Sequence, residues 1–523
     1  AHGNNDDLSQ AFPQFSHMQY SVYLQDEINV SERFKATVGV RFEVPVYPSI
    51  SGNENKDFTE IFADHGGYKT SDMPKARLSV APRVGFNWDM TGERKYILRG
   101  GTGIFSGRLP FVWLVSVAGN SNTIQNGLTL YRNETGDNMP SFHTNVSDML
   151  KDVYGGTYKK QDLPANTQPT ILDKKLKMPS TWKTSLALDL KLPGDVNLNI
   201  EGIYNRDFNS VTVTKLGIEK DANGIQLPGE PEKRALWKSQ GILNKDGALV
   251  TPYLINNTDL HGYYASISAQ LSKTWGFGLS VMAAYTYSSA KNVIDGIGDQ
   301  VTSAYNTNTF NKNGSNVPEL GYASYVSPHR ILLNVGYRLA NKNGASNFGL
   351  YYEASQLGYI SSYSYSRYSY TMGNVTGDGG GDVLLYIPTR EQLDDMPFAD
   401  NENKEAFWNF IQKDSYLSKH IGEYSKRGGA VMPWQHMLNF RFSQDFYVNV
   451  KGKRNTISLG IDINNLANML NRNWCNMDRL QSSRILNYNT KDKIYTFTAP
   501  KWSKYASTVS TWSAMFSIRY TFN

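Results

Sequence analysis

The chain has 523 residues and a mean hydropathy of −0.47. Its longest apolar stretch, residues 111–119, is far shorter than the roughly 18 residues that a membrane-spanning helix needs, which excludes a helical membrane protein. The 53 basic and 47 acidic residues give a net charge of +6, spread along the chain, so no basic tract indicates nucleic-acid binding. The single cysteine, Cys475, excludes an internal disulfide framework and a multi-cysteine zinc site.

Apolar and polar residues alternate in runs that come in pairs. In the first pair, Tyr20, Val22 and Leu24 alternate with polar neighbours, and after a break at residues 31–33 the alternation resumes from Phe34 to Phe42. This pattern predicts a hairpin with one apolar and one polar face. Five more pairs turn near residues 91–93, 193–194, 276, 343–344 and between 442 and 457, and a last run covers 512–522. We therefore expect thirteen antiparallel strands: six hairpins and one final strand.

The connection within each pair is short, whereas the connections between pairs are long. The long ones cover about 109–180, 206–260, 289–327, 359–432 and 467–510. Outer-membrane β-barrels have this order because their periplasmic turns are short and their extracellular loops are long. A large soluble β protein, such as a propeller, is the alternative, but it would need a second layer to cover so much apolar surface. The polar face carries charged residues at mid-strand, namely Arg41, Arg83, Arg99, Glu201, Arg338 and Arg441.

The sequence thus predicts an all-β fold, an antiparallel transmembrane β-barrel whose apolar face contacts outer-membrane lipid. The long loops carry some structure, because Phe407, Phe410 and Ile411 have helical spacing and predict a short surface helix within 402–425. No catalytic constellation is present, so we expect no enzymatic activity. Residues 100–107 resemble a phosphate-binding glycine loop, but they fall within a strand and we expect no helix after them.

Two groups of loop residues are candidates for substrate contacts. Trp113, Asn120 and Asn122 lie in the first of the listed long loops and could face the barrel mouth. Aromatic rings can stack on sugars or peptides, which makes a tyrosine-rich segment a second candidate surface. Its members are Tyr363, Tyr365 and Tyr368, although alternating tyrosines could equally extend a strand above the membrane.

One loop segment is a candidate calcium site. Asn374, Thr376, Asp378 and Asp382 are spaced somewhat like the oxygen ligands of a calcium loop. The alternative is a glycine-rich turn at the outer rim of the barrel, because Gly379, Gly380 and Gly381 follow in the same segment.

Several segments resemble the barrel of Bacteroidota TonB-dependent receptors, particularly the Oar-like branch. Each pattern is weak alone, but their order along nearly the whole chain makes the combined resemblance strong. The segments are 98–111 (LRGGTGIFSGRLPF), 285–290 (YTYSSA), 327–330 (SPHR), 368–388, 465–471 (NLANMLN) and the aromatic final strand.

The resemblance implies an energy-coupled importer, a barrel of about 22 strands closed by an N-terminal plug. Residues 1–523 would then be the C-terminal part of the barrel, with the plug, the TonB-contacting segment and about nine strands upstream or on a second chain. Strand parity agrees, because single-chain bacterial barrels have even strand numbers and thirteen places Ala1 in an extracellular loop.

We expect uptake of a bulky nutrient, such as an oligosaccharide or a peptide, with a surface lipoprotein as a further partner. A barrel that anchors surface proteins, or that belongs to a secretion complex, is the alternative function.

Overall fold

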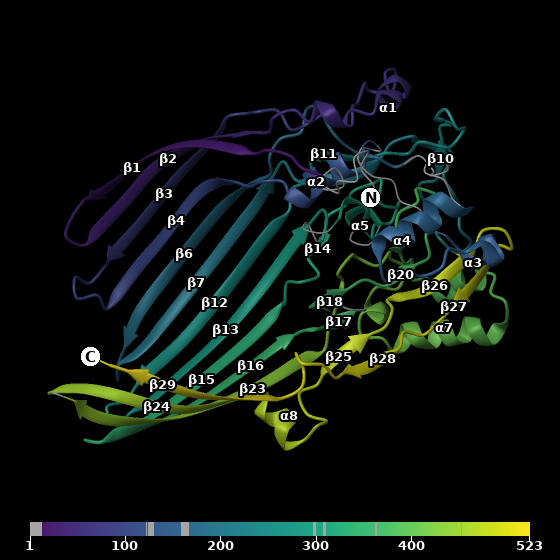
Figure 1. The fold of residues 1–523 in the computed structure, drawn as a ribbon. Helices are drawn as coiled ribbons and strands as arrows, with labels where there is room; N and C mark the ends of the chain where they lie inside the picture. The colour runs from purple at the N-terminus through teal and green to yellow at the C-terminus, as the bar shows by residue number, and fades with distance from the viewer. Residues whose placement is uncertain are drawn as a thin grey trace.

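The alternating runs form one large antiparallel sheet in the structure, a computed structural model that describes residues 13–121, 123, 130–157, 167–295, 300–306, 310–360, 363–450 and 452–522 (Figure 1). Thirteen strands follow one another in chain order across this sheet, and β14 (Gly321–Tyr322) adds a short fourteenth beside β13. The thirteen are β1 (Met18–Asn29), β2 (Phe34–Val46), β3 (Ser79–Asp89), β4 (Tyr96–Ser106), β6 (Ser180–Leu192), β7 (Val196–Phe208), β12 (Tyr263–Thr274), β13 (Leu279–Asn292), β15 (His329–Ala340), β16 (Gly344–Gln356), β23 (Trp434–Val450), β24 (Lys453–Asn464) and β29 (Ser513–Thr521). The predicted antiparallel fold and strand count are confirmed.

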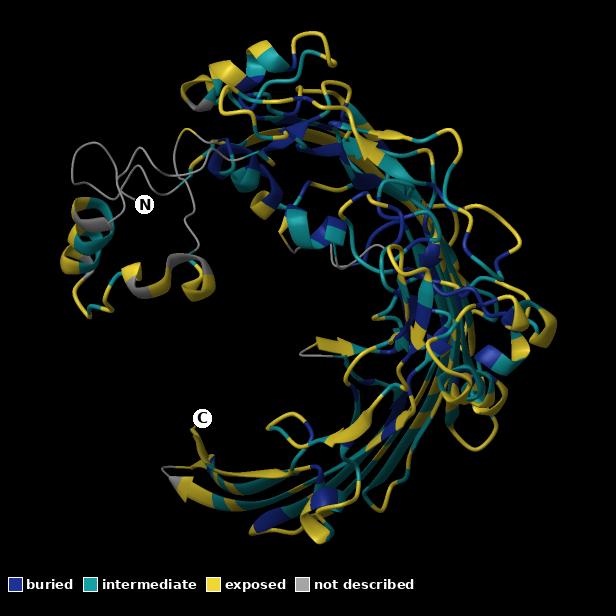
Figure 2. Ribbon diagram, turned by 90° about the vertical axis from the view of Figure 1, so that its right-hand side faces the viewer, coloured by how far each residue is buried: buried dark blue, intermediate teal, exposed yellow. Residues whose placement is uncertain are grey.

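The sheet curves but does not close. Figure 2 shows it bent into the shape of a C, with β1 and β29 as the two end strands of the pairing order. Every residue of β1 is exposed, and all but one residue of β29 are exposed. Within the described residues, the outer edges of β1 and β29 therefore have no strand beside them.

The two ends of the sheet differ in the length of their connections. At one end the hairpins close with tight turns, as at Gly194 and Asp195, whose φ angles of 76° and 57° suit residues that tolerate left-handed backbone. At the other end lie six long connections, one more than the sequence predicted, because residues 47–78 also form one. They span 47–78, 107–179, 209–262, 293–328, 357–433 and 465–512. We call the described parts of these connections the loop cap.

The strand register separates two faces of the sheet. Leu190, Leu198 and Leu271 pair directly across three strands, and Asp189, Asn199 and Gln270 pair on the opposite face. The charged residues that the alternation predicted for one face all lie on this second face, because the pairing keeps them in register. Near the loop end this face is covered, since Glu43, Ser288, Ser355 and Gln435 are buried there. Because the loops fold into the hollow of the C, we call it the inner face (Figure 2).

The hydrophobic core of the molecule lies in the loop cap and not in the barrel wall. The largest cluster of buried side chains joins residues from 227, 368–432 and 480–497. A second surrounds Trp113 and Tyr305, and a third surrounds Phe58 and Phe62. By contrast, large apolar side chains of the wall, such as Ile267 and Ile518, stay exposed on the outer face. This is expected for a surface whose partner is lipid.

Small sheets and short helices build the cap. Its strands are β5 (Thr170–Leu172), β8 (Val211–Lys215), β9 (Ile218–Lys220), β10 (Trp237–Ser239), β11 (Tyr253–Asn257), β17 (Gly358–Ile360), β18 (Tyr363–Tyr365), β19 (Arg367–Tyr368), β20 (Thr371–Met372), β21 (Val383–Leu384), β22 (Ala430–Val431), β25 (Met477–Leu480), β26 (Arg484–Asn489), β27 (Ile494–Phe497) and β28 (Trp502–Tyr505). Its α-helices are α1 (Lys56–Ile61), α2 (Phe111–Gly119), α3 (Arg132–Thr135), α4 (Val146–Leu150), α5 (Val301–Asn306), α6 (Arg390–Asp394), α7 (Asn401–Lys413) and α8 (Leu466–Leu470). Single 3-10 or π turns occur at η2 (Ser51–Asn53), η3 (Gly136–Asn138), η4 (Lys151–Thr157) and η6 (Leu417–Lys419).

The predicted loop helix is α7, and it is held by its apolar side. Phe407 and Ile411 are fully buried in the largest cluster, as their helical spacing predicted. The Asp400 carboxylate caps the helix by accepting a hydrogen bond from the Asn403 amide at 2.7 Å. None of the described helices is long and apolar enough to cross a membrane.

Candidate functional site

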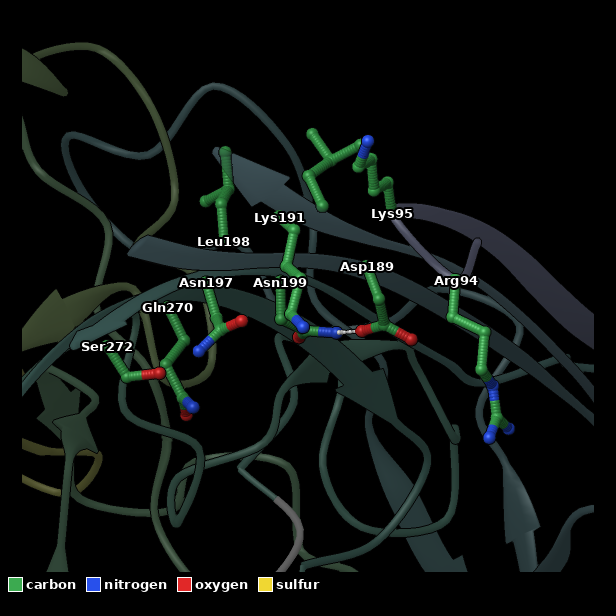
Figure 3. A pocket seen from close by; sticks show the side chains of 10 residues that line it. Arg94, Lys95, Asp189, Lys191, Asn197, Leu198, Asn199, Gln270 and Ser272 are labelled. Carbon is green, nitrogen blue, oxygen red and sulfur yellow. Dashed lines mark hydrogen bonds between the residues drawn. The ribbon is translucent and has the colours of Figure 1, made fainter. Parts of the chain in front are cut away.

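The inner face of the wall is lined by hydrogen-bonded charges. On β4, β6 and β7, the Arg99 guanidinium lies 3.0 Å from the Asp189 carboxylate and 3.9 Å from Glu201, and the Asn199 amide donates to Asp189. Asp189 and Asn199 line a cavity of about 140 Å³ near the tight turns, into which Asn197 and Gln270 also point, while Leu198 points to the other side (Figure 3). The predicted separation of Asn197 from Leu198 is therefore confirmed.

The opposite wall repeats this arrangement with other arginines. Arg330 contacts Glu353 at 2.8 Å, and Arg441 contacts Asp462 at 3.3 Å. Arg338 lies 3.6 Å from Asp445 and donates a hydrogen bond to Asn347 at 2.7 Å. Polar side chains of this kind are costly in hydrocarbon, so this face suits a water-filled or protein-filled lumen.

The glycine segment belongs to the wall. Gly100, Gly101 and Gly103 lie inside β4 and pair with β3 and β6 on both sides, which commits their backbone to the sheet. The expectation that no helix follows them is wrong, because α2 begins at Phe111. The strand pairing still leaves no free row of amides for a phosphate. The glycines fit a crowded wall, since a Cβ at Gly103 would lie 2.9 Å from the Pro82 carbonyl oxygen.

In the first group of predicted substrate contacts, Trp113 and Asn120 lie in different surroundings. Trp113 is fully buried in α2 and packs in a core cluster, so its ring cannot face an open mouth. The reason is that residues 111–119 form a helix and pack as one, where the sequence indicated a loop. Asn120 ends this helix and donates a hydrogen bond to Thr170 at 3.2 Å. Asn122 lies outside the described residues.

The three tyrosines of the second group also differ in their burial. Tyr363 is 64% exposed and Tyr365 is half-buried on the short strand β18, which pairs with β17 above the wall. Tyr368 instead packs in the largest core cluster with its hydroxyl 3.3 Å from that of Tyr370. Burial raises the pKa of Tyr368 to about 12, so it stays neutral. Within this segment, Tyr363 has the most exposed ring for stacking on a ligand.

The four candidate calcium ligands do not form an oxygen cage. The Asn374 side-chain amide donates to Asp378 at 2.9 Å, and the same carboxylate oxygen accepts from the Gly380 amide at 2.9 Å. The Thr376 hydroxyl and amide donate to the Asn374 oxygen, and Asp382 is paired with Arg484. These donors occupy the oxygens that a cation would need. Together with the nearby glycines, they form the tight turn that the sequence left as the alternative.

Buried charges hold the loops of the cap together, and sequence patterns missed them. Arg427 donates to the Val293 carbonyl at 2.7 Å and to the Glu319 carbonyl at 3.2 Å, although burial lowers its pKa. Arg234 and Glu230 form a fully buried pair at 2.7 Å. Lys215 is buried near Asp378, which opposes the lowering of the Lys215 pKa by burial. Non-periodic loop sequence contains no signal that separates these charges from exposed ones.

Comparison with known proteins agrees with this architecture. The family described as "Outer membrane beta barrel domain" matches residues 3–483, which is most of the chain. No curated protein sequence matches.

Three solved structures are similar in outline, each at 10% sequence identity. The outer membrane transporter YddB from Escherichia coli gives a TM-score of 0.45 over 96% of this chain and 45% of its own. The siderophore receptor PirA from Acinetobacter baumannii gives 0.40 over 89% and 44%, and a mutant of the ferric enterobactin receptor PfeA from Pseudomonas aeruginosa gives 0.39 over 86% and 40%. The chain thus spans less than half the length of each of these proteins. From the family match and its own antiparallel sheet, the chain belongs to the outer membrane β-barrel domain family.

Proposed function

We propose that this chain is the C-terminal part of a TonB-dependent barrel that takes up a bulky nutrient across the outer membrane. The observation that carries the proposal is the open sheet with a charged inner face. A wall lined by Arg99, Asp189, Glu201, Arg338 and Arg441 surrounds a polar interior, which a merely structural barrel does not need.

The exposed edges support the presence of further strands in the working protein. Unpaired backbone amides and carbonyls in hydrocarbon cost several kcal/mol each, so an open edge is not viable in lipid. In the proposal, β1 and β29 pair with strands from an upstream part of the same gene product or from a second chain. Thirteen of about 22 strands would then belong to this chain. A plug from the upstream part would fill the lumen and contact TonB.

The bulky substrate is proposed from the size of the cap. The cap folds over the hollow of the C and presents Tyr363 on its surface, which suits an oligosaccharide, a peptide or a surface lipoprotein that delivers either (Figure 2). One observation favours the alternative function of an anchoring barrel. The cap has its own buried core, so it could serve as a firm platform for a surface protein.

The test compares three strains: the parent, a strain without this gene, and a strain without TonB. Each grows on a mixture of oligosaccharides and peptides, and mass spectrometry of the spent medium identifies the compounds left behind. We expect the compounds that remain after deletion of this gene to be a subset of those that remain without TonB. If deletion changes no uptake and instead releases a surface protein, the anchoring function replaces the transport function.

A further inference from the structure

Six cations on or beside the inner ends of β3, β4 and β6 have no acidic partner. They are Lys75, Arg77, Arg83, Arg108, Lys177 and Lys183, and within the described residues none of their side chains forms an ion pair. This differs from the opposite wall, where Arg330, Arg338 and Arg441 are each paired with a carboxylate. The uncompensated positive charge is therefore concentrated on β3 and β6 and on the loop residues next to β3, β4 and β6.

Four of these cations surround a cavity at the loop end of the sheet, which we call the rim pocket. It has a volume of about 250 Å³, and Lys75, Arg77, Arg108 and Lys177 line it. Its floor includes Gln19, Glu43 and Ser79, which share the inner face by register, so the pocket opens to the lumen side. Leu176 and Met178 of the cap lie against it from the loop side.

The acidic residue that lines the rim pocket is already neutralised. The Glu43 carboxylate accepts hydrogen bonds from the Arg41 guanidinium at 2.6 Å and from the Gln19 amide at 3.3 Å, and it is buried. Arg41 thus offsets its charge, and the four lining cations remain uncompensated. Cavities lined by one sign of charge focus the field and concentrate ions of the opposite sign.

The other two cations, Arg83 of β3 and Lys183 of β6, lie next to the rim pocket. Arg83 and Lys183 both lie over the Phe105 ring, at 4.5 and 5.3 Å from its centroid, and line a second cavity of about 460 Å³. Ser106 lines the first cavity and Phe105 the second, so the two cavities are adjacent along β4. Arg83 lies four residues from Ser79, about 13 Å further along β3.

We infer that the rim pocket binds a small soluble ligand with two or more carboxylate or phosphate groups, and that Arg83 and Lys183 receive the same ligand deeper in the lumen. Arginine pairs with carboxylate and phosphate oxygens through a planar fork of donors, and lysine adds point charge, so the donor set fits either group. The inference deepens the proposed transport function and rests on it for the direction of ligand movement. The claim that the pocket binds such a ligand does not depend on the transport function.

The test measures anion binding to the full-length gene product in detergent, by isothermal titration with citrate in phosphate-free buffer. Sorbitol serves as the uncharged control probe. The test variant is Arg77→Gln with Arg108→Gln. The matched control is Lys175→Gln with Lys233→Gln, because these lysines are exposed in the loop cap outside both cavities and their loss changes the net charge equally. Thermal unfolding of all three proteins shows that they are folded.

We expect citrate to bind the native protein and the control variant alike, more weakly at high ionic strength, and the test variant on the order of tenfold more weakly. Sorbitol should bind none of them. Equal citrate binding by both variants would overturn the inference. It is also overturned if the native protein binds no citrate. If the test variant then melts at a lower temperature than the control, an acidic segment of the protein itself occupies the pocket. Binding is measured without TonB, so a failed uptake experiment leaves this result standing, and the reverse also holds.

Discussion

The assignment of the two faces can be tested with arginine substitutions on β7. The series uses Asn197→Arg on the inner face and Leu198→Arg and Ile200→Arg on the outer face. Leu198 packs between its partners Leu190 and Leu271, and neighbouring Asn197 points the opposite way (Figure 3). Asn197 and Leu198 have nearly the same depth, so they differ mainly in whether the new charge meets lipid or the lumen.

The expected cost follows from depth in the membrane. Strands rise about 3.3 Å per residue and tilt by about 45°, so Ile200, five residues beyond Asp195 of the turn, lies about 12 Å from the turn. That is close to the centre of an apolar band about 25 Å tall, where arginine costs about 2–4 kcal/mol. Leu198 lies at about 7 Å, so its cost falls between this value and the roughly 0–1 kcal/mol of the interface. Asn197→Arg should cost least.

The measurement is guanidinium unfolding of the full-length protein in lipid vesicles, followed by tryptophan fluorescence. The free energy of unfolding should decrease in the order Asn197→Arg, Leu198→Arg, Ile200→Arg. The same series in detergent should give smaller differences, because water reaches the outer face more easily there. A larger loss for Asn197→Arg than for Ile200→Arg would refute the register and the assignment of the inner face.

Four further predictions concern the cap and the edges. The melting temperature of the native protein should be the same with calcium and with a chelator, and the double variant Asp378→Asn with Asp382→Asn should show the same independence of calcium. A melting temperature that rises with calcium in the native protein would support the calcium site. Glu230→Gln should leave the buried Arg234 uncompensated and destabilise the cap by about 3–5 kcal/mol. Faster trypsin cleavage of the loops would measure this loss, and Glu219→Gln on an exposed strand is the control. Gly381→Ala should loosen the same loops, because its Cβ would clash with the Asn306 carbonyl oxygen, whereas Gly52→Ala, at a cap glycine with open space around it, should not. Mass spectrometry of the folded protein should detect a polypeptide beyond this 58.8 kDa chain, and a folded preparation without one would contradict the pairing of β1 and β29 with further strands.

The barrel wall could be predicted from sequence because its physical cause is local. Each strand separates lipid from lumen, so apolar and polar side chains must alternate, as in Val196 to Glu201. Tight turns such as Gly194-Asp195 then fix which runs pair. The thirteen strands and their order follow from these two signals. The sixth connection, 47–78, lies between the first two hairpins and carries η2 and α1, so it obeys the same short-long order as the five that were predicted.

The cap could not be predicted in the same way, because its contacts join segments that are far apart in the chain. Trp113 was a candidate for ligand contact only while residues 111–119 were expected to form a loop, and burial in a tertiary cluster removes it. The calcium spacing failed for a related reason. The spacing of residues in the sequence shows which positions carry side-chain oxygens. It does not show that the Asn374 amide donates to Asp378 or that Arg484 pairs with Asp382. The unpaired cations of the rim pocket also come from three separate segments.

The pairing of the cap strands has a consequence for the order of folding. Each wall strand pairs with neighbours in the chain order of the sheet, so the wall can form by adding one hairpin after another. In the cap, β5 pairs with β11, β17 with β25 and β20 with β26, all in parallel and across more than 80 residues. Closing such long loops is entropically costly unless their ends are already held together. Assembly of the wall provides that restraint, so the cap should gain its native contacts last, after insertion into the membrane.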